Sequence, residues 1–192
     1  MNAPALVALT VAGDAGAWRA AGFTVDDEGR CRVGHVCMQT GVGVTGIGGW
    51  TLGDASEVAS APEPPAHANG AVVLDHLVVL TGDPASTVDA YAALGLEVRR
   101  VRELGEGRTQ TFFRAGEAII ELVGPAGIDG EQFFGLAFTV TDLDACARQF
   151  GDALGRIKDA VQSGRRIATL RHETFGLTIP IAFMSAEPER AR

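Results

Sequence analysis

The sequence predicts an α+β fold built from repeated β-α-β-β-β modules, and three observations lead to this prediction. An aspartate that can cap a helix follows a short apolar run at three places, Asp14, Asp83 and Asp142. Short apolar runs separated by glycine follow each predicted helix and are typical of strands. The 192-residue chain contains 25 glycines, which suits turns and short strands better than a helical bundle. A module of this kind cannot bury its sheet face alone, so the modules are expected to pair.

The first predicted module occupies residues 1–53 and is degenerate. Residues 5–11 are an apolar run typical of a buried strand, and the short helix that follows ends at Gly22. Extended chain is expected to resume at 23–25, and two further strands are predicted at 33–40 and 42–52. The second of these is rich in glycine but is not a phosphate-binding loop, because no Lys-Ser or Lys-Thr pair follows it.

Residues 54–71 are predicted to be a linker. Pro62, Pro64 and Pro65 lie among alanine, serine and glutamate, without an apolar period. Because proline restricts the chain, such a linker is semi-stiff. It separates the first module from the remainder of the chain.

Residues 72–185 are predicted to contain two complete modules that pair with each other. The helix of one starts at Asp83-Pro84 and ends at Gly95, and the helix of the other ends at Gly151. The strands expected in these modules are, in order, 74–81, 96–104, 109–114, 118–123, 134–141, 154–161, 166–171 and 177–184. The charged residues 186–192 are expected to form a frayed tail.

The composition limits the classes of function. Hydrophobic residues make up 46% and charged residues 21% of the chain, as in ordinary globular domains. A net charge of −8 disfavours nucleic acids and anionic membranes as partners. No apolar run is long enough to span a membrane, and no signal peptide is expected at the N-terminus. The three cysteines lack Cys-x-x-Cys spacing, which favours reduced thiols and a cytoplasmic location.

Four short motifs resemble a known group of proteins. They are Leu-Asp-His-Leu-Val-Val at 74–79, the Asp-Pro helix start at 83–84, Gly-Leu-Glu-Val at 95–98 and Ile-Glu-Leu-Val-Gly-Pro at 120–125. Together with the repeated β-α-β-β-β order they resemble the glyoxalase, bleomycin-resistance and extradiol-dioxygenase group, the vicinal oxygen chelate superfamily. The resemblance implies that residues 72–185 form a cup-shaped, open-sided β-barrel of paired modules.

The resemblance also implies where a metal would bind. In the metalloenzymes of the family the ligands come from the first and last strands of each module, which places His76 and Glu121 at two ligand positions. Imidazole and carboxylate suit one divalent cation such as Zn, Mn, Fe or Ni. The third module has Gly135 and, to within a residue, Ile181 at the corresponding positions. The first module offers Val7 and a glycine, Gly46 or Gly48.

The expected metal site is therefore incomplete. A catalytic metal normally has three protein ligands and an open position. The nearest further candidates by residue type are His35, Gln110, His172 and Glu173. Without a metal, the alternative is a hydrogen-bonded histidine and glutamate in a polar pocket.

Two functions follow from this interpretation. The favoured one is a binding protein for a small molecule, with Phe113 in an apolar wall and Arg165, Arg166 and Arg171 holding an anionic group. The alternative is a divalent-metal-dependent lyase, isomerase or dioxygenase whose small substrate carries vicinal oxygens. In that enzyme Glu121 acts as metal ligand or as general base. The arginines at 99, 100 and 102 are expected to face solvent.

The odd number of modules predicts how the chain assembles. If the last two modules form the cup, the first has an unpaired sheet, and unpaired sheet edges associate readily. A homodimer in which two first modules pair is the expected outcome. The alternative is that the first module packs within the chain and covers the open side of the cup.

Overall fold

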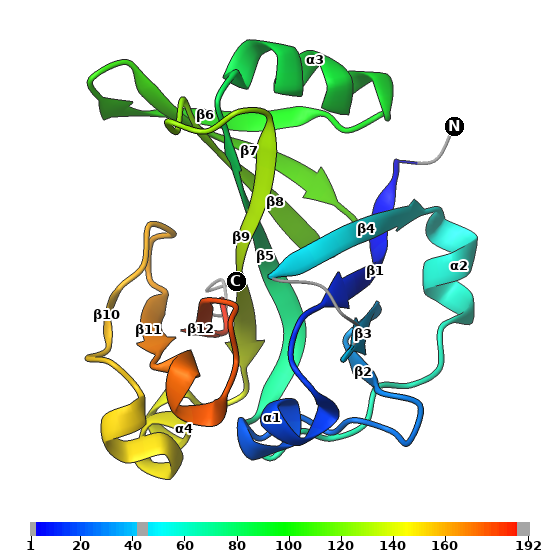
Figure 1. Cartoon of the computed structure of the whole chain (residues 1–192), viewed down its shortest axis with the longest axis vertical. Coiled ribbons are helices and arrows are strands. Elements are labelled where there is room, and N and C mark those ends of the chain that lie inside the picture. Colours follow the sequence, from blue (N-terminus) through cyan, green and yellow to red (C-terminus); the bar gives the residue numbers. More distant parts are fainter. Residues whose placement is uncertain (1–2, 42–45, 188–192) are drawn as a thin grey trace, which may run out of the picture.

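A computed structural model describes residues 3–41 and 46–187 of the chain (Figure 1). Within these residues the fold is α+β, with twelve strands in two sheets and four α-helices. None of the helices in the described ranges is long and apolar enough to cross a membrane. The predicted fold class is confirmed.

The larger sheet has eight strands and forms the curved wall of the molecule. Its members are β5 (Ala71–Thr81), β6 (Val98–Gly105), β7 (Arg108–Ala115), β8 (Ala118–Gly124), β9 (Glu131–Val140), β10 (Lys158–Asp159), β11 (Arg166–Leu170) and β12 (Ile181–Ser185). Their order is β10-β11-β12-β9-β5-β8-β7-β6, with β5 and β9 antiparallel at the centre. Each central strand runs parallel to the last strand of its own module, β8 or β12. The two halves are thus paired β-α-β-β-β modules.

The helices of these two modules begin where the sequence predicts. Helix α3 (Pro84–Ala93) is capped by Asp83, which accepts a hydrogen bond from the Ser86 amide at 3.1 Å. Helix α4 (Leu143–Phe150) is capped in the same way by Asp142. Both caps satisfy amide groups that a helix leaves without partners at its N-terminus. The last module also contains two short 3-10 turns, η1 (Gly151–Ala153) and η2 (His172–Phe175).

The N-terminal unit departs from the predicted module. It consists of β1 (Ala5–Val11), α1 (Ala15–Ala20), β2 (Arg30–Val33), β3 (Val36–Thr40), β4 (Ile47–Gly53) and α2 (Ala55–Ser60). The sheet order is β2-β3-β1-β4. Strand β3 takes the parallel position beside β1 that β8 has beside β5. Strand β4 pairs antiparallel with β1, as β9 does with β5.

Strand β4 therefore corresponds to the first strand of a further, truncated module. Asp54 follows it and caps α2, with Glu57 completing a capping box. This helix lies in the segment expected to be a linker. In place of the single strand expected at 33–40, the chain forms the β2–β3 hairpin, with β2 ending at Val33 and β3 starting at Val36. Part of the strand predicted at 42–52 falls on 42–45, outside the described residues.

The N-terminal unit packs within the chain, on the convex side of the large sheet (Figure 1). The Phe23 ring lies 4.9 Å from that of Phe138, and the Trp50 ring lies 5.2 Å from that of Tyr91. Aromatic side chains such as these bury about 150–250 Å² each, so they hold the N-terminal unit firmly against the paired modules. The unpaired first sheet that motivated the predicted dimer is thus covered by the chain itself, and it does not cover the cup.

Candidate functional site

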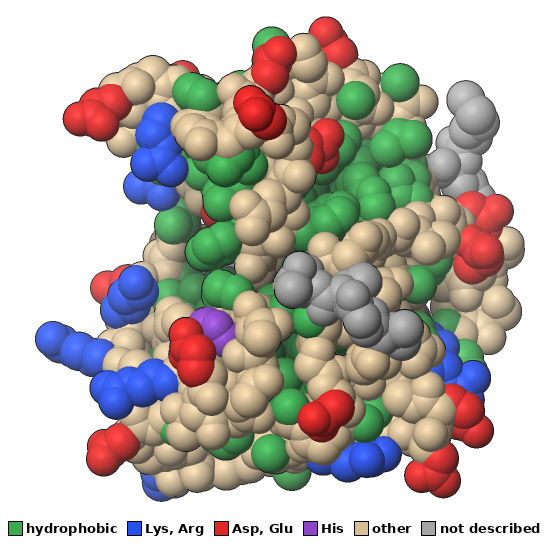
Figure 2. Space-filling view, viewed as in Figure 1, with side chains coloured by type: hydrophobic (Ala, Val, Ile, Leu, Met, Phe, Trp, Pro, Cys, Tyr) green, Lys and Arg blue, Asp and Glu red, His purple; other side chains and the backbone are tan. Residues whose placement is uncertain are grey.

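The concave face of the large sheet encloses a cavity of about 580 Å³ that opens at one side of the molecule. Figure 2 shows the hollow on the left, between the β6–β7 hairpin and the β10 region. The polar side chains that line it most deeply are His76, Gln110, Glu121 and Gln162, and the apolar ones include Phe112, Leu136, Ile167 and Met184. All described lining residues come from the two complete modules.

His76 lies on β5 beside an irregularity in the strand. The register between β5 and β9 shifts between Leu74 and His76, which leaves Asp75 as an extra residue in a β-bulge. His76 is buried, and its Nδ1 lies 2.6 Å from Asp75 Oδ1. Neither atom has another partner among the described residues, and their alignment is poor for a hydrogen bond. They are nevertheless close enough for the carboxylate to favour a proton on Nδ1.

The other ring nitrogen of His76 faces the cavity. Its Nε2 lies 3.0 Å from the side-chain nitrogen of Gln162, on the loop between β10 and β11. With the proton on Nδ1, Nε2 carries a lone pair and accepts a hydrogen bond from the Gln162 amide. A ligand or a metal therefore reaches His76 Nε2 only by displacing the Gln162 amide.

Asp75 is held in turn by a buried polar cluster. Its Oδ2 accepts hydrogen bonds from Thr139 Oγ1 and, at 2.5 Å, from Arg165 Nη2. Arg165 is 4% exposed and also donates from Nε to the Ser185 carbonyl at 2.9 Å. Burial alone raises the pKa of Asp75, but contacts with His76, Arg165 and Thr139 outweigh it and hold that pKa well below its usual range. Asp75 is therefore ionised near neutral pH.

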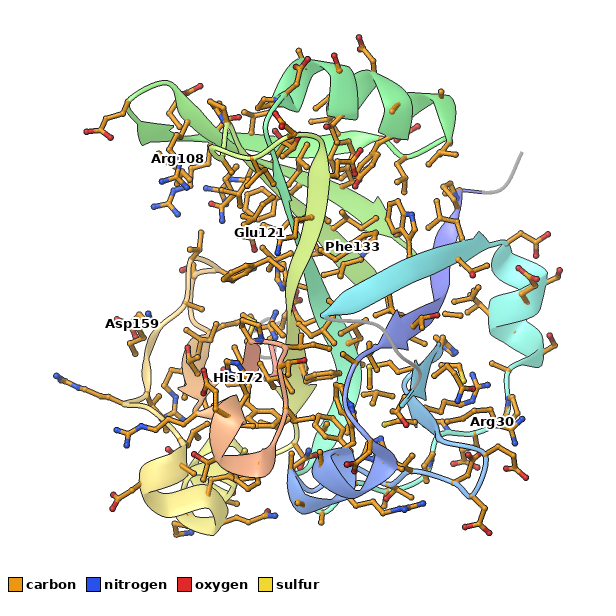
Figure 3. All side chains as sticks on the ribbon, viewed as in Figure 1. Arg30, Arg108, Glu121, Phe133, Asp159 and His172 are labelled. Carbon is orange, nitrogen blue, oxygen red and sulfur yellow. The ribbon has the colours of Figure 1, made fainter. Side chains whose placement is uncertain are left out.

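Glu121 lies on β8 and points into the same cavity, at the centre of Figure 3. One carboxylate oxygen accepts a hydrogen bond from the amide of Gln110 on β7. Because Val78 is opposite Glu121 in the parallel β5–β8 pair, strand geometry places the Cα atoms of His76 and Glu121 about 8 Å apart. The two side chains therefore face a common space.

The donor set does not fit a catalytic metal. In the β9–β12 pair Ala182 lies opposite Ala137, just as Glu121 lies opposite Val78 in the β5–β8 pair. Ala182 therefore takes the position that corresponds to Glu121. This is one residue from the expected Ile181, which is buried in the core instead. Gly135 occupies the position that corresponds to His76, and neither it nor Ala182 can ligate a metal. No three His, Cys, Asp or Glu side chains converge anywhere in the described parts of the chain.

The other candidate ligands lie apart from this set. His35 is 3.4 Å from Glu117, and His172 is 3.2 Å from its neighbour Glu173 on η2, both outside the cup. Of the additional candidates only Gln110 lines the cavity. Val7 and Gly48 belong to the N-terminal sheet and are also absent from the lining of the cup.

The structure separates the predicted ligand-binding residues from the cup. Phe113 is fully buried against Tyr91 on the convex side, whereas its neighbour Phe112 faces the cavity, 6.5 Å from the His76 ring. Successive side chains of a strand point to opposite faces, so a Phe-Phe pair does not reveal which ring is inside.

Two of the predicted anion-binding arginines are also placed elsewhere. Arg166 forms a two-pronged ion pair with Asp144 on α4, at 3.0 and 2.8 Å, and Arg171 precedes η2. Neither lines the cup. The third, Arg165, is the one that reaches the site, through Asp75.

Comparison with known proteins identifies the family. Residues 73–166 match the model of the Glyoxalase/Bleomycin resistance protein/Dioxygenase superfamily. The chain belongs to this superfamily through that segment, which contains His76 and Glu121. No curated protein matches the sequence.

Solved structures show the same fold. Methylmalonyl-CoA epimerase from Mycobacterium tuberculosis superposes with a TM-score of 0.51 at 19% identity, over 62% of this chain and 91% of that one. The H200E variant of homoprotocatechuate 2,3-dioxygenase from B. fuscum superposes with a TM-score of 0.63 at 14% identity, over 97% of this chain and 73% of that one. The second superposition includes the N-terminal unit, whose packing therefore also has a counterpart among solved structures.

Proposed function

We propose that this protein binds a small molecule in the cup and that its metal site is incomplete. The observation that carries the proposal is the presence of Gly135 and Ala182 at two of the four positions expected to hold ligands. The cavity itself is retained, with an apolar wall and a few convergent polar groups, as in sites for small ligands. Binding is assigned to residues 72–185, and residues 1–53 support the convex side.

The polar groups define what a ligand meets in the cup. His76 Nε2 and one oxygen of Glu121 already accept hydrogen bonds from the amides of Gln162 and Gln110, which leaves the second oxygen of Glu121 to accept one from a ligand. A ligand with a hydroxyl or N–H group near its centre donates to this oxygen without a metal, and it reaches His76 Nε2 by displacing the Gln162 amide. The aromatic face of Phe112 then contacts the apolar body of the ligand.

One observation favours a second function, that of a divalent-metal-dependent enzyme. Histidines that bind metals usually donate their other ring N–H to a carboxylate, and Asp75 lies in that position beside His76. Such an enzyme would need a further ligand beyond His76 and Glu121. Gln110 is the side chain in the cup that stands closest to Glu121.

Metal analysis separates the two functions. Wild-type protein, His76→Ala and Glu121→Ala are incubated with Zn, Mn, Fe or Ni, passed over a desalting column and analysed by inductively coupled plasma mass spectrometry. We expect well under one equivalent of metal in the wild type. Near-stoichiometric metal that is lost in both variants would overturn the proposal and favour the enzyme. Retained folding of the variants is checked by circular dichroism.

The proposal includes assembly as a homodimer in the cytoplasm. Its support is strand β6, an edge strand exposed along its whole length that displays Val98, Val101 and Leu104. An edge of this kind readily accepts a strand from a second copy. Light scattering coupled to size-exclusion chromatography tests it, and a monomer at micromolar concentration would exclude it. The three cysteines are free, in keeping with a reducing compartment.

A further inference from the structure

The β6–β7 hairpin differs in charge from the rest of the protein. Residues 98–115 contain five arginines and two glutamates, a net charge of +3, although the whole chain carries −8. The remaining residues therefore carry −11. A positive segment on an acidic protein concentrates anions at one place on its surface.

Arg100, Arg102 and Arg108 lie on the face of the sheet that lines the cup, on the half of the hairpin nearer its turn, whereas Arg114 lies at the far end of β7. Arg100 is opposite Phe112 and Arg102 is opposite Gln110 in the β6–β7 pairing, and both partners line the cavity. Directly opposed residues of an antiparallel pair project from the same face. Arg108 precedes Gln110 by two residues and shares its face. Figure 3 shows Arg108 pointing from the hairpin toward the mouth of the cup. We call Arg100, Arg102 and Arg108 the arginine rim.

The arginine rim is not neutralised by the protein. Among the residues that the structure describes, no carboxylate lies within 4.0 Å of any of its three guanidinium groups. Within the described residues, the one hydrogen bond from these guanidinium groups is long, at 3.5 Å from Arg102 Nη1 to Gln110 Oε1. By contrast, the exposed Arg30, Arg99 and Arg166 all have carboxylate partners.

The opposite side of the mouth also carries a cation. Lys158 on β10 lines the cavity, and its strand partner Ile167 lines it as well. Figure 2 shows basic side chains on both sides of the hollow. Asp159 is the one acidic residue on that side of the lining, so the mouth as a whole is cationic while the floor carries Glu121.

We infer that the ligand of the cup is an anion, with a carboxylate or phosphate group held at the mouth by the arginine rim. The inference rests on the proposed function of the cup. The body of the ligand lies against Phe112, and the charged group remains at the opening, where guanidinium groups bind carboxylates and phosphates through paired hydrogen bonds. This position avoids placing the negative group beside Glu121.

The test uses three small aromatic probes and fluorine NMR at low salt. They are 4-fluorobenzoate, 4-fluorophenyl phosphate and the neutral 4-fluorobenzyl alcohol, each titrated with protein. We expect at least one anion to bind about tenfold or more tightly than the alcohol, since hydrogen bonds to charged groups are the stronger ones. A preference between the two anions identifies the carboxylate or the phosphate as the natural group.

Three variants link the preference to the site. Arg100→Gln/Arg102→Gln/Arg108→Gln should weaken the bound anion about tenfold or more and leave the alcohol unchanged. Arg30→Gln/Arg148→Gln/Arg166→Gln is the matched control, because it lowers the net charge equally at exposed sites outside the cup. Measured again for all variants at moderate salt, where distant charges are screened, this control should leave all affinities within about twofold. Ala182→Phe fills the cup and should abolish binding of every probe.

Each contrary result has a distinct meaning. Equal affinity for anions and alcohol, or no effect of the rim substitutions, would overturn the inference while the cup remains a binding site. Anion binding that survives Ala182→Phe would show that the arginines act outside the cup, and would overturn it as well. Failure of all three probes to bind at millimolar concentration would count against both the inference and the proposed function.

Discussion

Asp75 and His76 are neighbours in the chain, and yet both side chains are buried and their Oδ1 and Nδ1 atoms lie 2.6 Å apart. In a regular strand two successive side chains would point to opposite faces. The β-bulge at Asp75 removes this restriction, and Arg165 and Thr139 then fix the carboxylate. Asp75 therefore fixes the orientation of the His76 ring from the side that faces away from the cup.

This relationship predicts the tautomer of His76. Nitrogen-15 NMR of the neutral form of the imidazole should show the proton on Nδ1 and the lone pair on Nε2, because Asp75 faces Nδ1. Asp75→Asn should replace this with a mixture of tautomers. Asp144→Asn, which changes an exposed carboxylate far from the cup, serves as the control. A wild-type spectrum with the proton on Nε2 would contradict the arrangement.

The buried Asp75–Arg165 pair should also matter for stability. Removing one partner of a buried ion pair leaves the other charge without compensation and costs about 3–5 kcal/mol in the free energy of unfolding. We expect Arg165→Met to have an effect of this size in urea denaturation. Arg166→Met, at the next position, breaks an ion pair with Asp144 that is exposed to solvent and should change stability little. Equal effects of the two substitutions would show that burial of the first pair is unimportant.

The same pair predicts how stability depends on pH. The pKa of Asp75 is lower in the folded protein than its ordinary value of about 3.9 in an unfolded chain. Its contribution is therefore complete above that unfolded value and is lost as the pH falls toward the folded one. The free energy of unfolding should fall more steeply below about pH 4 in the wild type than in Asp75→Asn. Parallel curves for the two proteins would argue against a depressed pKa.

Much of the large sheet could be predicted from the sequence because its signals are local. The apolar runs at 74–81 and 118–123 and the caps at Asp83 and Asp142 each specify an element within a few residues. His76 and Glu121 were recognised as candidates because they interrupt such runs, and the structure brings both into one cavity.

What the sequence did not reveal depends on contacts between distant segments. The pairing of β1 with β3 and β4 is a matter of register, which no local signal determines in the glycine-rich N-terminal unit. Phe112 and Phe113 have the same side chain and differ only in the face they occupy. The role of Arg165 arises from a contact 90 positions away in the chain. The prediction that the arginines at 100 and 102 face solvent is confirmed, but the sequence does not show that their strand borders the cup.

The proposal that the metal site is incomplete can be tested by adding a further ligand. Ala182 occupies the position equivalent to Glu121. Ala182→Glu therefore adds a third side chain that can ligate a metal, next to His76 and Glu121. We expect this variant to retain close to one equivalent of Zn or Mn after desalting, whereas the wild type does not. Ala182→Leu adds a side chain of similar size without a ligand and should bind none. Metal analysis gives the content, and a raised melting temperature with metal gives an independent measure of binding.

The corresponding substitution at Gly135 should fail, for a reason visible in the backbone. A Cβ atom added there would lie 2.8 Å from the carbonyl oxygen of Pro180, closer than such atoms approach. Gly135→His therefore forces β9 and the start of β12 apart, and we expect it to lower the melting temperature without conferring metal binding. Gly135→Ala tests the steric part alone and should destabilise the fold as well. If Gly135→His instead bound metal in a stable protein, the close approach of the two strands would not be what excludes a ligand from this position.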